Sequence, residues 1–189
     1  MLREVLDKIE KKKIKELAIC SIKVEFEQDE KIIKKIERIE KELNKIEAGV
    51  FVTLKVDGKL RGCIGFPYKK PLGKAVKEAS KLSAFYDPRF LPLNKDELKK
   101  IDVEITLLSE PEEIKEKEIE KILKEIEIGK HGLMIKSNRG SGLLLPQVAL
   151  EYNMDPITFL EATCLKAGLD KDSWTKENVK IFKFEGFWF

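Results

Sequence analysis

Residues 50–66 read VFVTLKVDGKLRGCIGF, two runs of strand-forming residues on either side of Asp57-Gly58. An Asp-Gly pair between two such runs is the strongest short-range signal for a β-hairpin. A two-residue loop pairs Cys63 with Val52, and strand alternation then predicts that Arg61 and Cys63 lie on the apolar face of the first strand. The hairpin predicts an antiparallel sheet around which the other elements arrange.

The second run is unusual for a strand because it contains Gly62 and Gly65, and a glycine weakens strand packing. Two glycines so close together predict that another backbone or a ligand approaches this strand. The chain contains 32 lysines and only five arginines, so a guanidinium is used sparingly. Three of the five, Arg61, Arg89 and Arg139, lie in segments that are neither ordinary helix nor ordinary strand. Because a guanidinium can bind an anion in a bidentate fashion, the pattern predicts a binding site.

The rest of the chain alternates between helical and strand patterns. Apolar periodicity, capping signals and prolines predict helices over 13–27, 30–47, 72–84, around 94–97, over 112–127, from Pro146 to Tyr152 and from Asp155 to Gly168. Alternation and apolar runs predict strands over 101–108, 129–135 and 179–189. Strands scattered among helices predict an α+β fold with antiparallel sheets.

Composition restricts the class of protein. Of 189 residues, 42% are hydrophobic and 38% are charged, which indicates a water-soluble domain with a core, or two small lobes that share one. The interleaved lysines and glutamates are typical of proteins adapted to high temperature. The net charge of +3 and the absence of a basic stripe argue against nucleic-acid binding.

Neither a signal peptide nor a membrane span is predicted. Residues 1–6 already have the pattern of an amphipathic helix, and no apolar run approaches 18 residues, so we expect a cytoplasmic protein. The three cysteines have no CxxC spacing, and His131 is the single histidine. We therefore expect no disulfide framework, no metal site and no resident cofactor.

Several stretches, in this order, resemble the AMMECR family, named for the AMME syndrome chromosomal region. The resemblance covers roughly residues 14–184 and rests on Leu60-Arg61-Gly62-Cys63-Ile64-Gly65, Asp87-Pro88-Arg89-Phe90 with Pro92, Gly129-Lys130-His131-Gly132-Leu133, Ser141-Gly142-Leu143-Leu144-Leu145-Pro146-Gln147-Val148-Ala149, Phe159-Leu160, and Cys164-Leu165-Lys166-Ala167-Gly168-Leu169 with Trp174.

The resemblance implies one α+β domain over residues 1–189, made of two unequal, intertwined lobes with a cleft where the motif segments meet. The family has no settled biochemical activity. Its bacterial members occur fused to Memo-type domains and beside radical-SAM proteins, which suggests such proteins as partners. An older interpretation gives the family a basic role in transcription, replication, repair or translation.

The candidate catalytic pair is Cys63 and His131, a thiol and an imidazole, with Arg61 lowering the thiol pKa or holding a substrate carboxylate. Alternatively, Cys63 packs as a small apolar side chain. Arg61 and Arg89 are expected to clamp a carboxylate or phosphate. Alternatively, Arg89 pairs with Asp87 and Arg61 ties loop carbonyls together.

The other candidate ligand-binding residues are Gly62, Gly65 and Gln147. The glycines permit close approach, and the amide of Gln147 faces a ligand or caps backbone groups. The turn that contains Arg139 lacks the Gly-Lys-Ser/Thr ending of a phosphate loop, so a nucleotide site is disfavoured.

Two functions follow from these residues. The first is a small-anion-binding cleft protein, an enzyme or an accessory to one, in which Arg61 and Arg89 bind the anion. The second is a non-catalytic adaptor that docks a protein partner such as a Memo-type protein. The sequence leaves open whether the protein is an enzyme.

Overall fold

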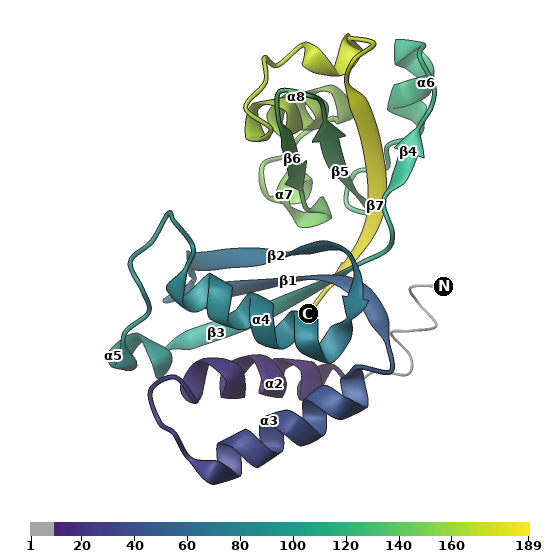
Figure 1. Ribbon diagram of the computed structural model, residues 1–189. Helices are drawn as coiled ribbons and strands as arrows, with labels where there is room; N and C mark the ends of the chain where they lie inside the picture. The colour runs from purple at the N-terminus through teal and green to yellow at the C-terminus, as the bar shows by residue number, and fades with distance from the viewer. Residues whose placement is uncertain (1–9) are drawn as a thin grey trace. The chain divides into compact units, whose positions relative to one another are not determined.

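The structure is a computed structural model that describes residues 10–189 (Figure 1). The helix predicted at residues 1–6 lies outside this range. The described chain forms two compact units. Unit 1 comprises the described residues up to Ser109 together with Phe187–Phe189, and unit 2 comprises Glu110–Gly186. The chain therefore passes from one unit to the other twice, and each unit is described by itself.

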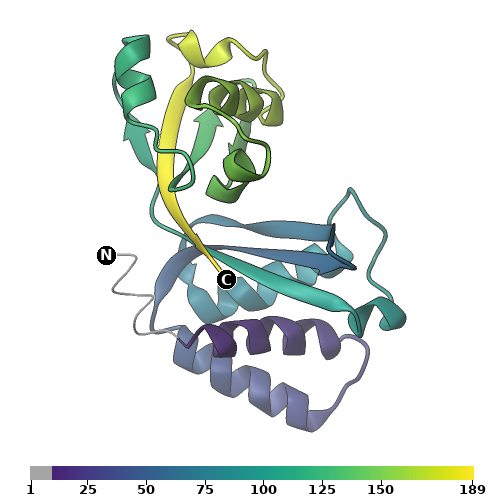
Figure 2. The ribbon, with the colours of Figure 1, turned by 180° about the vertical axis from the view of Figure 1, so that it is seen from behind.

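Unit 1 is an antiparallel sheet of three long strands with helices on one face, and its segment Phe187–Phe189 adds to the sheet beside the third strand. The strand order is β2-β1-β3, with β1 at Glu47–Val56, β2 at Lys59–Pro71 and β3 at Ile101–Leu108. The helices are α2 (Lys11–Lys23), α3 (Glu30–Leu43), α4 (Leu72–Phe85) and the short α5 (Lys95–Leu98). Figures 1 and 2 show the three long helices on the same side of the sheet in both views.

The core of unit 1 lies between this sheet and the helices. Val50, Val52 and Leu54 of β1 are fully buried there, against helix residues such as Leu17 and Val76. Strand alternation sends the intervening β1 side chains, Phe51, Thr53 and Lys55, to the opposite face. We call this opposite face the far face; it also carries Cys63 and Gly65 of β2 and Glu104 and Thr106 of β3, which the register aligns with Thr53 and Phe51.

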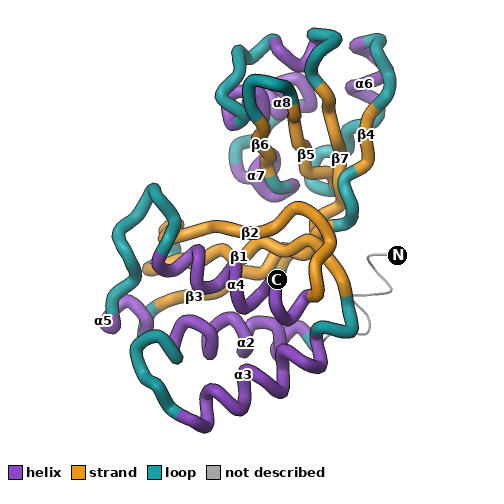
Figure 3. The backbone as a smooth tube through the Cα atoms, in the orientation of Figure 1, coloured by secondary structure: helices purple, strands orange, loops and turns teal. Residues whose placement is uncertain are grey.

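Unit 2 contains a second antiparallel arrangement, in which β7 (Lys180–Trp188) pairs with both β4 (Glu112–Ile114) and β5 (His131–Lys136), and β5 pairs with β6 (Ser141–Leu144). Its helices are α6 (Ile119–Lys124), α7 (Pro146–Glu151) and α8 (Pro156–Lys166), which Figure 3 labels. A 3-10 turn, η1, follows at Ser173–Thr175. Phe159 and Leu160 of α8 pack with Leu133 of β5 in its core.

The last helix of unit 2 begins and ends as the sequence predicts. The Asp155 carboxylate accepts a hydrogen bond from the Thr158 N–H at 2.7 Å, and Pro156 opens the helix. Gly168 follows the helix with φ +73°, a conformation that glycine adopts without strain.

The α+β prediction with antiparallel sheets is confirmed. The helix predicted over 112–127 is wrong in its first part, because residues 112–114 form β4. These residues pair with Ile181–Lys183 of β7, and this long-range pairing overrides the helical preference of a Lys/Glu-rich segment. Among the described residues, no helix combines the length and the apolarity that crossing a bilayer requires.

The hairpin of β1 and β2 is confirmed, but its predicted register is wrong. Cys63 lies opposite Thr53, not Val52, because β2 contains an extra residue between Leu60 and Gly62. That residue is Arg61, which has no partner in β1, as in a β-bulge. Cys63 consequently lies on the far face instead of the apolar face.

Candidate functional site

Arg61 is fixed by the short helix α5. Its Nε and Nη2 donate to the two carboxylate oxygens of Glu97 at 2.7 and 3.0 Å, and its side chain is 14% exposed. The same carboxylate accepts a hydrogen bond from the Asn94 N–H, which closes the capping box of α5. The bulge in β2 therefore directs Arg61 toward a side-chain partner, not toward loop carbonyls.

One atom of Arg61 has no such partner. Among the described residues, no acceptor reaches Nη1, and this nitrogen is buried. A buried donor without an acceptor costs about 1–3 kcal/mol. The guanidinium lies 5.8 Å from the centre of the Phe90 ring, and that of Arg89 lies 5.4 Å from the same ring.

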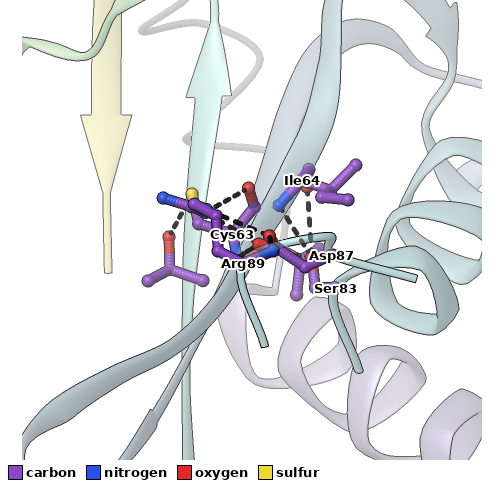
Figure 4. Close-up of polar contacts among 7 residues, drawn as sticks. Cys63, Ile64, Ser83, Asp87 and Arg89 are labelled. Atoms are coloured by element: carbon purple, nitrogen blue, oxygen red, sulfur yellow. Dashed lines mark hydrogen bonds and ion pairs between the residues drawn. The ribbon is translucent and has the colours of Figure 1, made fainter. Parts of the chain in front are cut away.

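Asp87 and Arg89 form a clamp on the strand at Cys63 (Figure 4). Arg89 donates to the Asp87 carboxylate through Nε at 3.0 Å and Nη2 at 2.7 Å, and Nη2 also donates to the Cys63 carbonyl at 3.3 Å. Asp87 in turn accepts a hydrogen bond from the Cys63 N–H at 2.9 Å. The Asp87 side chain is 2% exposed, whereas the Arg89 side chain is 44% exposed.

The clamp sets the charge of Asp87. Burial alone raises the pKa of this carboxyl, but hydrogen bonds from the Arg89 side chain and from the Cys63 and Arg89 N–H groups outweigh it. The pKa of Asp87 is consequently lowered to about 2. Asp87 is therefore ionised at neutral pH and is a poor general base.

The Cys63 thiol is held in its protonated form. Burial raises its pKa, although a hydrogen bond from the Thr53 hydroxyl at 3.2 Å and the charge of Arg89 act in the opposite direction. The cation near the sulfur is thus Arg89; the expected lowering of the pKa by Arg61 does not occur. A nucleophilic role for Cys63 needs a ligand or a partner group that stabilises the thiolate.

The glycines of the motif accommodate the protein's own backbone. A Cβ on Gly62 would overlap the carbonyl oxygen of Ser83 in α4. A Cβ on Gly65 would overlap the Val50 carbonyl and the Phe51 ring, which lies across it. Of the two predicted reasons for these glycines, the approach of another backbone is the one seen, and a ligand-binding role for them stays a prediction.

Ser83 connects α4 to both strands of the hairpin (Figure 4). Its hydroxyl accepts a hydrogen bond from the Ile64 N–H at 2.8 Å and donates one to the Val52 carbonyl at 2.8 Å. Val52 and Ile64 are opposite each other in the register, so the hydroxyl bridges the two strands where a ladder bond would otherwise run.

His131 lies in unit 2, at the start of β5. Its Nδ1 accepts a hydrogen bond from the Glu127 N–H at 3.0 Å, so the neutral ring carries its proton on Nε2. Burial lowers its pKa, and the charges of Lys183 and Lys130 lower it further. The lone pair that a general base needs is already occupied, which leaves the ring as a hydrogen-bond donor. The Cys63–His131 pair stays a prediction, since its members belong to different units.

The remaining predicted residues also lie in unit 2. Gln147 is the second residue of α7 and is only 8% exposed, and its role as a ligand-binding residue stays a prediction. Arg139 is exposed in a turn where the Ser137 hydroxyl accepts the Arg139 and Gly140 N–H groups at 3.1 and 3.2 Å. These donors are engaged within the turn, which agrees with the absence of a phosphate-loop motif.

Four residues of the site in unit 1 escaped prediction as site residues: Thr53, Ser83, Glu97 and Glu104. Polar residues recur at every second position of β3 and at Thr53 and Lys55 of β1, which signals a polar sheet face and could have identified Thr53 and Glu104. Glu97 was predicted only as a cap, and nothing in the sequence distinguishes Ser83 from the other small residues of α4. In residues 10–189, no group of three or more histidine, cysteine, aspartate or glutamate side chains is arranged to hold a metal ion.

Comparison with known proteins gives consistent matches. The profile described as AMMECR1 matches residues 15–189. A protein of Aquifex aeolicus is 52% identical over 141 residues, which are 73% of this chain and 72% of the relative. A protein of Nanoarchaeum equitans is 43% identical over 152 residues, 79% of this chain and 84% of the relative. The crystal structure of an uncharacterized protein from Pyrococcus horikoshii superposes with a TM-score of 0.70 at 41% identity, covering 75% of this chain and 72% of that one.

Proposed function

The chain belongs to the AMMECR1 family, which has no characterised activity, and we propose that it binds a small oxyanion, a carboxylate or a phosphate, beside Arg61 and Arg89. The observation that carries the proposal is the buried Nη1 of Arg61, which no acceptor among the described residues reaches. An oxygen of a ligand that enters beside Phe90 would supply the acceptor and remove the cost of the buried donor.

The geometry of the two arginines supports the same ligand class. Each arginine donates through Nε and Nη2 to a carboxylate, Glu97 for Arg61 and Asp87 for Arg89. Both guanidiniums lie beside the Phe90 ring. Donors held in place lose little conformational entropy when a ligand binds. Because the two carboxylates neutralise the two guanidiniums, affinity comes from directed hydrogen bonds and not from net positive charge.

Cys63 has a supporting role in this proposal. As a neutral thiol below the exposed guanidinium of Arg89, it contacts the ligand as a weak hydrogen-bonding group, and a bound group that stabilises the thiolate would make it a nucleophile. The proposed compartment is the cytoplasm, where reducing conditions keep thiols free; all three cysteines are free here.

The test is a thermal-shift screen of small carboxylates and phosphates against the wild type, Arg61→Lys and Arg89→Lys. Lysine keeps the charge but loses the planar fork that binds an oxyanion. Arg38→Lys is the matched control, because Arg38 is an exposed residue of α3 outside the site. A ligand at a hundred times its Kd stabilises the folded protein by about 2.7 kcal/mol.

A ligand whose stabilisation is lost in Arg61→Lys and Arg89→Lys but kept in Arg38→Lys supports the proposal. Stabilisation that survives in both site variants would assign the ligand to another place. A screen in which no compound raises the Tm of the wild type counts against oxyanion binding. If Arg61→Lys does not fold, Arg89→Lys decides alone, since the 44% exposed Arg89 is the less structural of the two.

A second candidate function is docking of a protein partner, favoured by apolar exposure around the clamp. Tyr86 is 71% exposed and Leu91 is 83% exposed, and these two residues directly precede and follow the segment Asp87–Phe90 in the sequence. Tyrosine and arginine are residue types enriched in binding hot spots, and Tyr86 lies close in sequence to Arg89. The partner that the family resemblance suggests is a Memo-type protein.

Titration with a Memo-type protein from the same source tests this candidate. Binding to the wild type that Leu91→Asp abolishes supports docking at the clamp. Leu165→Asp is the control, because Leu165 is 63% exposed in unit 2. No binding to the wild type excludes this partner.

A further inference from the structure

The far face of unit 1 carries a row of three chemically different side chains. Thr53 of β1 lies directly opposite Cys63 of β2 on one side and Glu104 of β3 on the other. The three therefore form one cross-strand row with a thiol, a hydroxyl and a carboxylate on the same face. Neighbouring strands are about 4.8 Å apart, so the ends of the row are roughly 10 Å apart at the backbone.

The row is ordered by its own hydrogen bonds. Thr53 is 6% exposed, and its hydroxyl donates its single proton to the Cys63 sulfur at 3.2 Å. The hydroxyl oxygen therefore remains available as an acceptor. At the other end, Glu104 accepts a hydrogen bond from Lys55 at 3.1 Å, and these two side chains are 22% and 30% exposed. The carboxylate is thus partly desolvated, yet a ligand can reach it.

Opposite charges act on the two sides of the thiol. The positive charge of Arg89 lowers the pKa of Cys63, whereas the negative charges of Asp87 and Glu104 raise it. The Asp87 side chain is almost fully buried, whereas those of Arg89 and Glu104 are partly exposed, so Arg89 and Glu104 are the charged groups that a ligand can meet. A neutral thiol and a hydroxyl lie between a cationic end and an anionic end.

We propose that the ligand of this site is an amino acid-like zwitterion, whose carboxylate binds Arg89 and whose ammonium group binds Glu104 across the Cys63–Thr53–Glu104 row. This inference rests on the proposed oxyanion site and names its ligand class. The backbone span of the row suits a ligand whose amine is several bonds from its carboxylate, and it disfavours a short α-amino acid. The Thr53 oxygen is the acceptor nearest the middle of such a ligand.

The test compares acids that differ only in the amine. Calorimetric titration is carried out with γ-aminobutyrate and ε-aminohexanoate, and with butyrate and hexanoate as their amine-free counterparts. An ammonium–carboxylate hydrogen bond is a charge-assisted one, so we expect the amino compound to bind about tenfold tighter or more than its counterpart. Glu104→Gln should remove this advantage, and it should not weaken binding of the amine-free acid, because it removes a nearby negative charge.

Two further variants make the result specific. Lys55→Met removes the cation that competes for Glu104, so the advantage of the amine should increase. Glu37→Gln is the matched control, because Glu37 is an exposed glutamate of α3, away from the sheet. A purely structural role of Glu104 would weaken amino and amine-free acids alike, and would not predict the gain in Lys55→Met.

Each remaining outcome overturns the inference. Equal binding of an amino acid and its amine-free counterpart contradicts the zwitterion but leaves the oxyanion proposal intact. An advantage that persists in Glu104→Gln assigns the ammonium to another group. If none of the compounds binds, the zwitterion proposal is wrong. It is also wrong if Arg89→Lys changes the affinity of no compound, and that result would show in addition that Arg89 is not part of the oxyanion site.

Discussion

At the scale of single residues, Asp87 connects the charge of the site to its backbone. One buried carboxylate receives the Arg89 side chain and the Cys63 N–H, so the exposed guanidinium is oriented by the same group that fixes the strand. The sequence allowed Asp87–Arg89 pairing as an alternative, because the two residues flank one proline. It could not reveal the bond to Cys63, which joins residues 24 positions apart.

Asp87→Asn is expected to destabilise the protein by about 2 kcal/mol at neutral pH. The pKa of Asp87 falls from 3.8 to about 2 on folding, and each unit corresponds to about 1.4 kcal/mol. Because the folded pKa is the lower one, this stabilisation is present above pH 3.8 and is lost as the pH falls through 2. Urea unfolding of both proteins between pH 7 and pH 2 measures it.

The difference in the free energy of unfolding between the wild type and Asp87→Asn is expected to decrease as the pH falls toward 2. Asp96→Asn is the control, since the Asp96 side chain is 94% exposed. A difference that stays constant over the whole pH range would mean that the carboxylate acts by shape and not by charge.

His131 offers a residue-scale prediction in unit 2. Burial and two neighbouring lysines lower its pKa, and protonation would break the hydrogen bond from the Glu127 N–H. We expect the midpoint of its NMR titration, which reports its pKa, to lie below the ordinary value of 6.5. In the neutral form the proton should be on Nε2. Since the folded pKa is depressed, stability should decline as the pH falls below the unfolded value. A midpoint at or above 6.5 would contradict the observed hydrogen bond.

At the scale of elements, the hairpin of β1 and β2 could be predicted from the sequence, whereas the bulge in β2, which sets its register, could not. Alternating apolar residues and Asp57-Gly58 sufficed to predict the hairpin. The extra residue at Arg61 has no local signal, because a bulge is favoured by contacts with distant elements, here α5 through Glu97. One shifted position moved Cys63 to the other face of the sheet.

Ser83 provides the element-scale prediction. Ser83→Ala should destabilise unit 1 by about 1–3 kcal/mol, because it leaves the Ile64 N–H and the Val52 carbonyl without their bridge. Ser80→Ala is a closely matched control: Ser80 is equally buried on the same helix, but its hydroxyl donates only to the Val76 carbonyl of its own helix. Chemical denaturation measures the free energy of unfolding of both variants. Equal losses in the two variants would show that the Ser83 bridge does not contribute to stability.

At the scale of the whole molecule, lysine–glutamate pairs join different elements as well as residues of one helical turn, such as Lys34 and Glu30. Lys13 pairs with Glu42 at 2.7 Å and Lys35 with Glu16 between α2 and α3, and Lys77 pairs with Glu40 at 2.6 Å between α3 and α4. The sequence indicates a surface rich in interleaved lysine and glutamate from composition alone. It did not predict which elements are joined, since that depends on helix packing.

Raising NaCl from 20 mM to 1 M should lower the Tm by a few degrees, because salt screens exposed ion pairs. A variant with glutamine in place of Glu16, Glu40 and Glu42 should show a smaller salt dependence. Differential scanning calorimetry of both proteins checks the prediction. A Tm that rises with NaCl in both would show that these pairs do not contribute.

The strand β7 ends in a different unit from the one in which it begins. The backbone N–H and carbonyl of Phe189 pair with those of Ile105 at 3.1 and 3.0 Å, within unit 1. Ribosomal synthesis produces Ile105 before any of unit 2 and Phe189 after all of it. Unit 1 must therefore wait through the translation of unit 2 before its sheet is complete, and a nascent chain stalled within unit 2 would present Ile105 with no native partner from the C-terminal strand.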